Sequence, residues 1–118
     1  MQTISIKSGT SAKISITPKI NGVAATASQL SGMTIYVFLV HQFTNKIYKT
    51  PYQLTSGNLT INLTPADTVE MLGNAEDNQK FEIQFAIKNS SGNIVAEEKD
   101  SSVAINIVRW EAGLWLQK

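Results

Sequence analysis

The chain contains no cysteine and only one histidine among its 118 residues. Without thiols it can form no disulfide, no thiolate metal site and no cysteine nucleophile. A serine-histidine-carboxylate triad would have to use His41, and no serine stands in a Gly-x-Ser-x-Gly elbow. We therefore predict no catalytic residue, no metal site and no cofactor, and we expect His41 at a strand end or on the surface.

The chain also lacks an excess of charge of either sign and lacks a long hydrophobic run. Ten basic and nine acidic residues leave a formal net charge of +1. Nucleic-acid-binding surfaces need an excess of Lys and Arg to neutralise phosphates. The longest apolar run, residues 35–40, is far shorter than the roughly 20 residues that span a bilayer. We expect neither nucleic acid nor membrane as a partner.

Two groups of carboxylates remain as candidates for chemistry. They comprise Glu70, Glu76 and Asp77 in one group and Glu97, Glu98 and Asp100 in the other. Neither group has the regular ligand spacing of an EF-hand calcium loop. A glycosidase needs a pair of carboxylates in a substrate cleft, for which a chain of this length leaves little room. We interpret both groups as solvated side chains, with a calcium site as the alternative.

Residues 81–95 carry the clearest structural signal. Large apolar side chains at 81, 83, 85 and 87 alternate with smaller or polar ones, which is typical of a strand with one buried face. Residues 89–93 follow with turn-forming types, and Gly92 suits a positive φ. The pattern predicts a β-hairpin at the centre of the core.

Further alternating segments predict a chain built almost wholly of short strands. They lie at residues 3–7, 13–17, 33–41, 47–50, 58–63 and 103–108, with a turn at Asn21-Gly22 and a loop at residues 23–28. Thr64 and Pro65 open the one helical signature, and Gly73 ends it. We predict one domain, residues 1–118, with the fold of an antiparallel immunoglobulin-like β-sandwich of seven to nine strands and one short helical turn near residues 65–72. A small barrel is the competing architecture.

The segment at residues 33–41 is apolar on both faces, unlike the other predicted strands. Strands with this pattern are usually covered on both sides. We therefore expect something to lie over the outer face of this strand, either loops of the chain itself or another subunit.

The C-terminal residues 109–118 contain both tryptophans of the protein. If the strands end near residue 108, the large side chains of this segment either fold back over the domain or enter a neighbouring molecule. Tryptophan is a frequent anchor in protein interfaces. We predict a docking tail at 109–118, with four partner-binding residues: Trp110, Leu114, Trp115 and Leu116.

Aromatic side chains elsewhere offer a second function. Tyr36, Tyr48 and Tyr52, together with the two tryptophans, have faces on which sugars or bases stack, although strand aromatics more often pack in a core. The alternative function is therefore a carbohydrate-binding β-sandwich module.

The order of these features resembles a known group of proteins. It runs from Ser8-Gly9-Thr10 through Asn21-Gly22 and Leu30-Ser31-Gly32 to residues 59–68 and the hairpin at 81–95. This order is similar to the immunoglobulin-like N-terminal domain of tailed-phage baseplate upper proteins and related small virion accessory domains. The resemblance implies a non-enzymatic structural protein of the virion. It would be a capsid decoration protein or a tail or baseplate adaptor, with other virion proteins as partners and self-association within a lattice left open.

Overall fold

The computed structural model describes residues 2–49 and 51–116, which fold mostly into β-structure. The strands are β1 (Gln2–Lys7), β2 (Ala12–Ser15), β3 (Lys19–Ile20), β4 (Val23–Ala24), β5 (Thr34–His41), β6 (Tyr52–Leu54), β7 (Thr60–Leu63), β8 (Asn78–Lys88) and β9 (Ile94–Val108). The helices are α1 (Ala27–Leu30), α2 (Pro65–Leu72) and α3 (Glu111–Leu116). Nine strands in the described residues agree with the predicted seven to nine.

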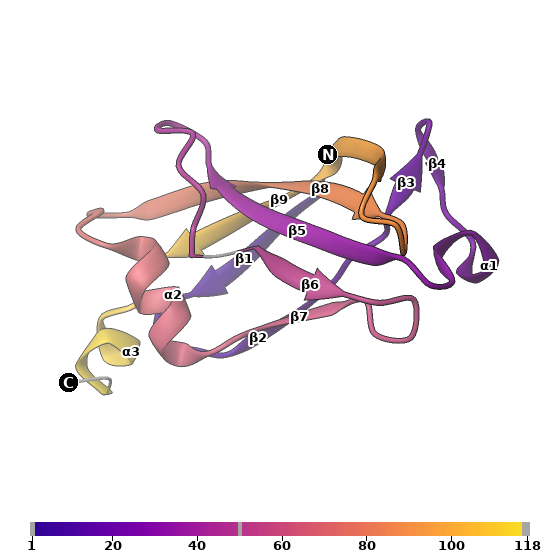
Figure 1. The fold of residues 1–118 in the computed structure, drawn as a ribbon. Helices are drawn as coiled ribbons and strands as arrows, with labels where there is room; N and C mark the ends of the chain where they lie inside the picture. Colours follow the sequence, from indigo (N-terminus) through magenta and orange to yellow (C-terminus); the bar gives the residue numbers. More distant parts are fainter. Residues whose placement is uncertain (1, 50, 117–118) are drawn as a thin grey trace.

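Two layers of strands enclose the core, as Figure 1 shows. The larger sheet has the strand order β1-β9-β8-β5-β6, and β2 pairs with β7 in the smaller layer below it. All neighbours in the larger sheet are antiparallel except β1 and β9, which run parallel. The prediction of a purely antiparallel fold is therefore wrong, because the first strand pairs with the last one rather than with its successor in sequence.

The core lies between these layers and is built around β8, as predicted. Phe81, Ile83, Phe85 and Ile87 are each at most 3% exposed and face the smaller layer. They meet aliphatic side chains of β2 and β7 in one continuous cluster. At roughly 1.5–3 kcal/mol for each such side chain, their burial is a large part of the stability of the fold.

Turn chemistry places the hairpin at residues 81–95 and the turn at Asn21-Gly22 where the sequence predicts them. Asn21 and Gly22 have φ values of 53° and 79°, the pair of positive angles that a tight two-residue hairpin requires between β3 and β4. Gly92 has φ of 83° in the turn between β8 and β9, where Asn89 Oδ1 accepts from the amides of Ser91 and Asn93.

Helix α2 confirms the helical signature. Thr64 Oγ1 accepts a hydrogen bond from the backbone amide of Asp67, and Asp67 Oδ2 accepts one from the backbone amide of Thr64. The two hydrogen bonds form a capping box. Gly73 ends the helix with φ of 58°. Met71 and Leu72 are buried in the core, so the helix closes one end of it.

Two predictions about local structure need correction. The predicted loop at residues 23–28 contains β4 and the start of α1, whose capping box pairs Thr26 with Gln29. The second strand of the hairpin at residues 81–95 and the strand predicted at residues 103–108 form one strand, β9, because its pairing with β8 resumes after a register shift.

The strand predicted at residues 47–50 is short. Ile47 makes an antiparallel bridge with Val40 of β5, and the amide of Tyr48 donates to the carbonyl oxygen of Leu39 at 2.8 Å. Further along the same strand, β5 pairs with β6.

The outer face of β5 is only partly covered. Val40 is buried, whereas Tyr36 and Phe38 are half-buried on the face that points away from the core. Among the outer side chains of β5, the expected cover is therefore complete only over Val40.

Candidate docking site

Helix α3 splits the four residues of the predicted docking tail into two pairs. Trp110 is half-buried just before the helix, and Leu114 packs against the hydrophobic core. Trp115 and Leu116 are 69% and 63% exposed. One pair therefore folds back on the domain, while the other points into solvent. Residues 117–118 of the predicted tail lie outside the described residues.

A contact between two glycines holds α3 on the domain. A Cβ atom on Gly113 would lie 2.0 Å from the carbonyl oxygen of Ser8, and one on Gly9 would lie 2.4 Å from the carbonyl oxygen of Gly113. Real Cβ atoms do not approach other atoms so closely, so only glycine fits at either position. Gly9 also has φ of 81°, which favours glycine independently. The helix thus rests directly on the backbone of the turn after β1.

Buried hydroxyl groups complete this attachment. Ser8 is fully buried, and its Oγ accepts the amide of Trp110 at 2.9 Å. Thr68 of α2 is also fully buried; its Oγ1 accepts the amide of Gly9 at 2.9 Å and lies 2.9 Å from the carbonyl oxygen of Thr10. Because buried polar groups are costly when unpaired, these hydrogen bonds hold the turn after β1 in one position against α2 and the start of α3.

Arg109 ties the start of this segment to the loop after α2. Its amide donates to the carbonyl oxygen of Asp77 at 2.7 Å, and its guanidinium donates to the carbonyl oxygen of Ala75 at 3.1 Å. Its Nε lies 2.6 Å from a carboxylate oxygen of Glu111 in the first turn of α3. Lys7 adds a cation–π contact, with Nζ 5.5 Å from the ring centre of Trp110.

The result is a fixed helix with an exposed apolar end. Trp115 lines a cavity of about 420 Å³ together with Arg109, Glu111, Ala112 and Leu114. Figure 1 places α3 beside α2 at one end of the molecule, opposite α1 and the β3–β4 hairpin. Trp115 and Leu116 therefore form a small apolar tip, which we call the α3 tip.

Helix α2 next to it carries the most perturbed carboxyl group. Burial by itself would raise the pKa of Asp67, but the Lys49 ammonium, the Thr64 amide and the Tyr48 hydroxyl stabilise the carboxylate and lower that pKa to about 2. Burial and the same carboxylate raise the pKa of Tyr48 above its usual range. Charged Asp67 thus links α2 to the segment before β6 and has a structural role.

His41 ends β5 and is half-buried, as predicted for a strand-end residue. Its Nδ1 accepts the amide of Thr44 at 3.2 Å, so Nε2 carries the proton and donates to Oε1 of Gln79. Both ring nitrogens are thus used in holding the turn after β5.

The remaining candidates are dispersed. Tyr48 is bonded to Asp67, and the hydroxyl of Tyr52 is buried, so these two rings are parts of the packing rather than open platforms. In the part of the chain that the structure describes, no three His, Asp or Glu side chains converge as a metal site. The side chains of Glu98 and Asp100 lie outside the described residues. No described helix is long and apolar enough to cross a membrane.

Sequence reasoning missed the residues that place the α3 tip. From the sequence, Ser8 and Gly9 are predicted only as turn residues, and neither Thr68 nor Gly113 is predicted to contact them. The available signal was weak: a glycine in the middle of an apolar C-terminal segment, which often marks a close approach of two backbones.

Comparison of the chain with protein-family models, with curated proteins and with solved structures found no match.

Proposed function

We propose that this chain is a non-enzymatic structural protein of a tailed-phage virion, either a capsid decoration protein or a tail or baseplate adaptor. It docks on a larger assembly of virion proteins through the α3 tip. The resemblance of its feature order to baseplate upper proteins and related virion domains supports the class. The exposed α3 tip supports the mode of attachment.

We further infer an immunoglobulin-like arrangement of the strands. In that fold, strands C, F and G are neighbours in one sheet and B pairs with E in the other. Here β5, β8 and β9 are neighbours in the larger sheet, and β2 pairs with β7 in the smaller one. The parallel pair β1–β9 adds an edge strand to the sheet that corresponds to C, F and G.

The observation that carries the proposed function is the contrast within α3. Fixed exposed aromatic side chains lose little conformational freedom on binding, which favours Trp as an interface anchor. Trp115 is 69% exposed, yet its helix is held by the contact of Gly113 with Ser8. An apolar end held in one position is suited to docking into a pocket of a partner.

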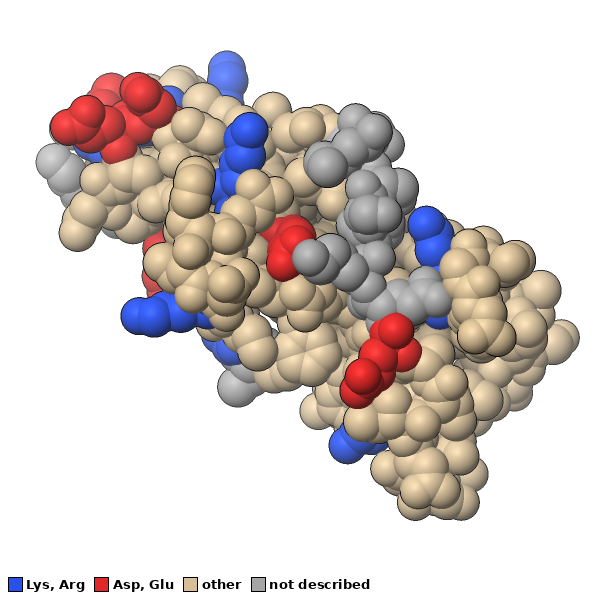
Figure 2. Space-filling view, turned by 90° about the horizontal axis from the view of Figure 1, so that it is seen from above, with Lys and Arg blue, Asp and Glu red and all other residues tan. Residues whose placement is uncertain are grey.

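The surface charge is compatible with a protein partner. Seen from above the larger sheet, one cluster of acidic side chains lies at one end, further acidic groups lie along the face, and Lys and Arg stand singly among uncharged residues (Figure 2). No continuous basic patch is visible on this side among the described residues. Phosphate backbones need such a patch, whereas protein interfaces do not.

Incorporation into particles tests this function. We expect quantitative mass spectrometry of purified particles to detect the wild-type chain, and we expect the double variant Trp115→Ala/Leu116→Ala to lose at least about tenfold in copy number, since hot-spot anchors contribute 2 kcal/mol or more. Val23→Ala is the matched control, because Val23 is also 69% exposed but lies on the β3–β4 hairpin at the other end. Absence of the wild-type chain from particles, or full incorporation of the double variant, would contradict the proposal.

A further inference from the structure

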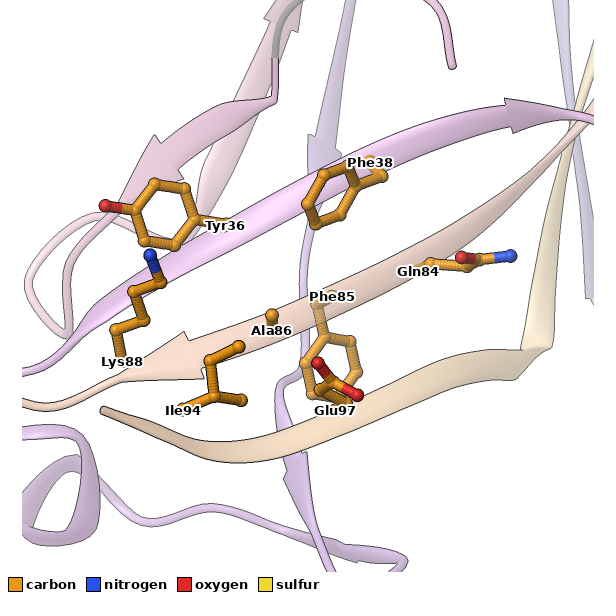
Figure 3. A pocket seen from close by; sticks show the side chains of 8 residues that line it. All are labelled: Tyr36, Phe38, Gln84, Phe85, Ala86, Lys88, Ile94 and Glu97. Carbon is orange, nitrogen blue, oxygen red and sulfur yellow. The ribbon is translucent and has the colours of Figure 1, made fainter. Parts of the chain in front are cut away.

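A second cavity lies over the larger sheet, and most of its lining side chains are on the outer face of that sheet. It has a volume of about 620 Å³ and is an open groove along β8. Its lining comes from three neighbouring strands, and Figure 3 shows the side chains on this face. This volume lies within the range of small-molecule sites, which run from about 300 to 1,000 Å³.

A small residue between larger ones creates the groove. Ala86 of β8 is directly opposite Tyr36 of β5 on one side and Glu97 of β9 on the other. Its methyl group is therefore the floor, and the neighbouring strands supply the walls. Tyr36 and Phe38 form the wall on β5, while Ile94 and Glu97 form the wall on β9 (Figure 3).

Polar groups close both ends of this groove. At one end Lys88 Nζ lies 5.2 Å from the ring centre of Tyr36. At the other end lies the side-chain amide of Gln84, whose Nε2 donates to Glu82 Oε1 at 3.0 Å and whose carbonyl oxygen is an acceptor (Figure 3). The groove thus offers a donor at one end, an acceptor at the other and a carboxylate acceptor at the wall.

The chemistry of this lining selects among ligands. One ammonium and one carboxylate leave the groove with no net charge, so neither a phosphate-bearing nor a strongly cationic ligand is favoured. Two ring faces suit apolar C–H surfaces, and the surrounding donors and acceptors suit hydroxyl groups. A neutral sugar combines these two kinds of surface in one molecule.

The spacing of the rings adds a preference for length. Tyr36 and Phe38 are two residues apart on one strand, which corresponds to about 7 Å. A ligand of consecutive rings that runs along β5 can contact both aromatic side chains. We propose that the groove over Ala86 is a binding site for a neutral oligosaccharide or polysaccharide, with Tyr36 and Phe38 as stacking residues and Gln84, Lys88 and Glu97 as hydrogen-bonding residues.

This site is separate from the α3 tip, so the two proposals can fail independently. The double variant Trp115→Ala/Leu116→Ala changes no residue of the groove, so it should bind polysaccharide like the wild type. Conversely, substitutions at Tyr36 and Phe38 change no residue of the α3 tip.

Affinity gel electrophoresis tests the proposal on the full-length protein. The gels contain laminarin, dextran, xylan, galactomannan or soluble starch as neutral probes, and alginate as an anionic one. We expect at least one neutral polysaccharide to retard the protein and its longer oligosaccharides to compete better than shorter ones. No retardation by any of the five neutral probes, or retardation by alginate alone, overturns the proposal.

Matched variants assign the binding to the groove. Tyr36→Leu and Phe38→Leu retain apolar volume but remove the rings, and each should weaken binding about tenfold or more, as loss of a stacking face does for planar ligands. Phe43→Leu is the control, because Phe43 is 83% exposed and does not line the groove. Thermal melting of each variant confirms the fold.

In Ala86→Leu the larger side chain occupies the bottom of the groove. This variant should therefore show no retardation by polysaccharide. Wild-type retardation in this variant or in both leucine variants overturns the proposal. If the wild-type protein binds no polysaccharide and Ala86→Leu changes its sedimentation coefficient, the groove is a protein–protein contact. That result also overturns the proposal.

Discussion

Helices α2 and α3 lie at the same end of the molecule, yet they are stabilised in different ways (Figure 1). Helix α2 has a capping box, a buried ion-paired carboxylate and two side chains in the core. The only buried residue of α3 is Gly113, and its last two residues are exposed. The comparison teaches that α2 closes the core, whereas α3 is held by its backbone and is available for contact with another molecule.

The largest expected difference between the helices is in core burial. Leu72 of α2 is fully buried, so Leu72→Ala should lower the free energy of unfolding by about 2–5 kcal/mol. The same substitution at Leu116 of α3, which is 63% exposed, should change it by less than about 0.5 kcal/mol. Urea denaturation of both variants measures the difference. Equal losses would show that α3 is part of the core.

A smaller effect comes from the charge that holds α2. The pKa of Asp67 is about 2 in the folded protein, below the usual 3.8 of an aspartate, so its carboxylate stabilises the fold above about pH 4. This stabilisation should be lost as the pH falls from about 4 to about 2 and amounts to about 2 kcal/mol.

Urea denaturation from pH 7 to pH 2 checks this linkage. Wild type should lose about 2 kcal/mol more than Asp67→Asn over that range, because the variant has no carboxyl group to protonate at this position. Parallel pH profiles for the two proteins would refute a stabilising role of the charge.

The smallest expected effect concerns the attachment of α3. Gly113→Ala places a methyl group against the carbonyl oxygen of Ser8, but a short surface helix can move away instead of straining the core. We therefore expect a cost of only about 1 kcal/mol, at the low end for overpacking. In a Trp115→Phe background, where Trp110 is the single tryptophan, we also expect increased acrylamide quenching of Trp110 fluorescence. Gly57→Ala is the control, since nothing lies within 4 Å of its added Cβ. Unchanged quenching in Gly113→Ala would contradict attachment through this contact.

Local chemistry made much of the fold predictable. The central hairpin follows from alternation at Phe81–Ile87 and from turn residues after Lys88, and α2 follows from Thr64, Pro65 and Gly73. These signals act within a few residues of the chain, where dihedral preferences and capping bonds decide the structure. The capping box at Thr26 and Gln29 was equally local and would have revealed α1.

Strand partners were not predictable in the same way. The sequence predicts a strand only at residues 47–50, yet β5 pairs both with Ile47, through a single bridge, and with Tyr52–Leu54, which form β6. Likewise, nothing near Gln2–Lys7 indicates a parallel partner about 100 residues away in β9. Such pairings depend on how the layers stack rather than on propensity.

The amino-acid sequence by itself determined the apolar rows, the turns and the capped helix, because each depends on neighbours in the chain. It also indicated that the large side chains of residues 109–118 either fold back over the domain or enter a neighbouring molecule. Only the tertiary structure decided which of them fold back and which form the α3 tip, and it alone made a groove above Ala86. Those outcomes depend on contacts between segments far apart in sequence, such as Gly9 with Gly113 and Tyr36 with Ala86, and on the space left between them.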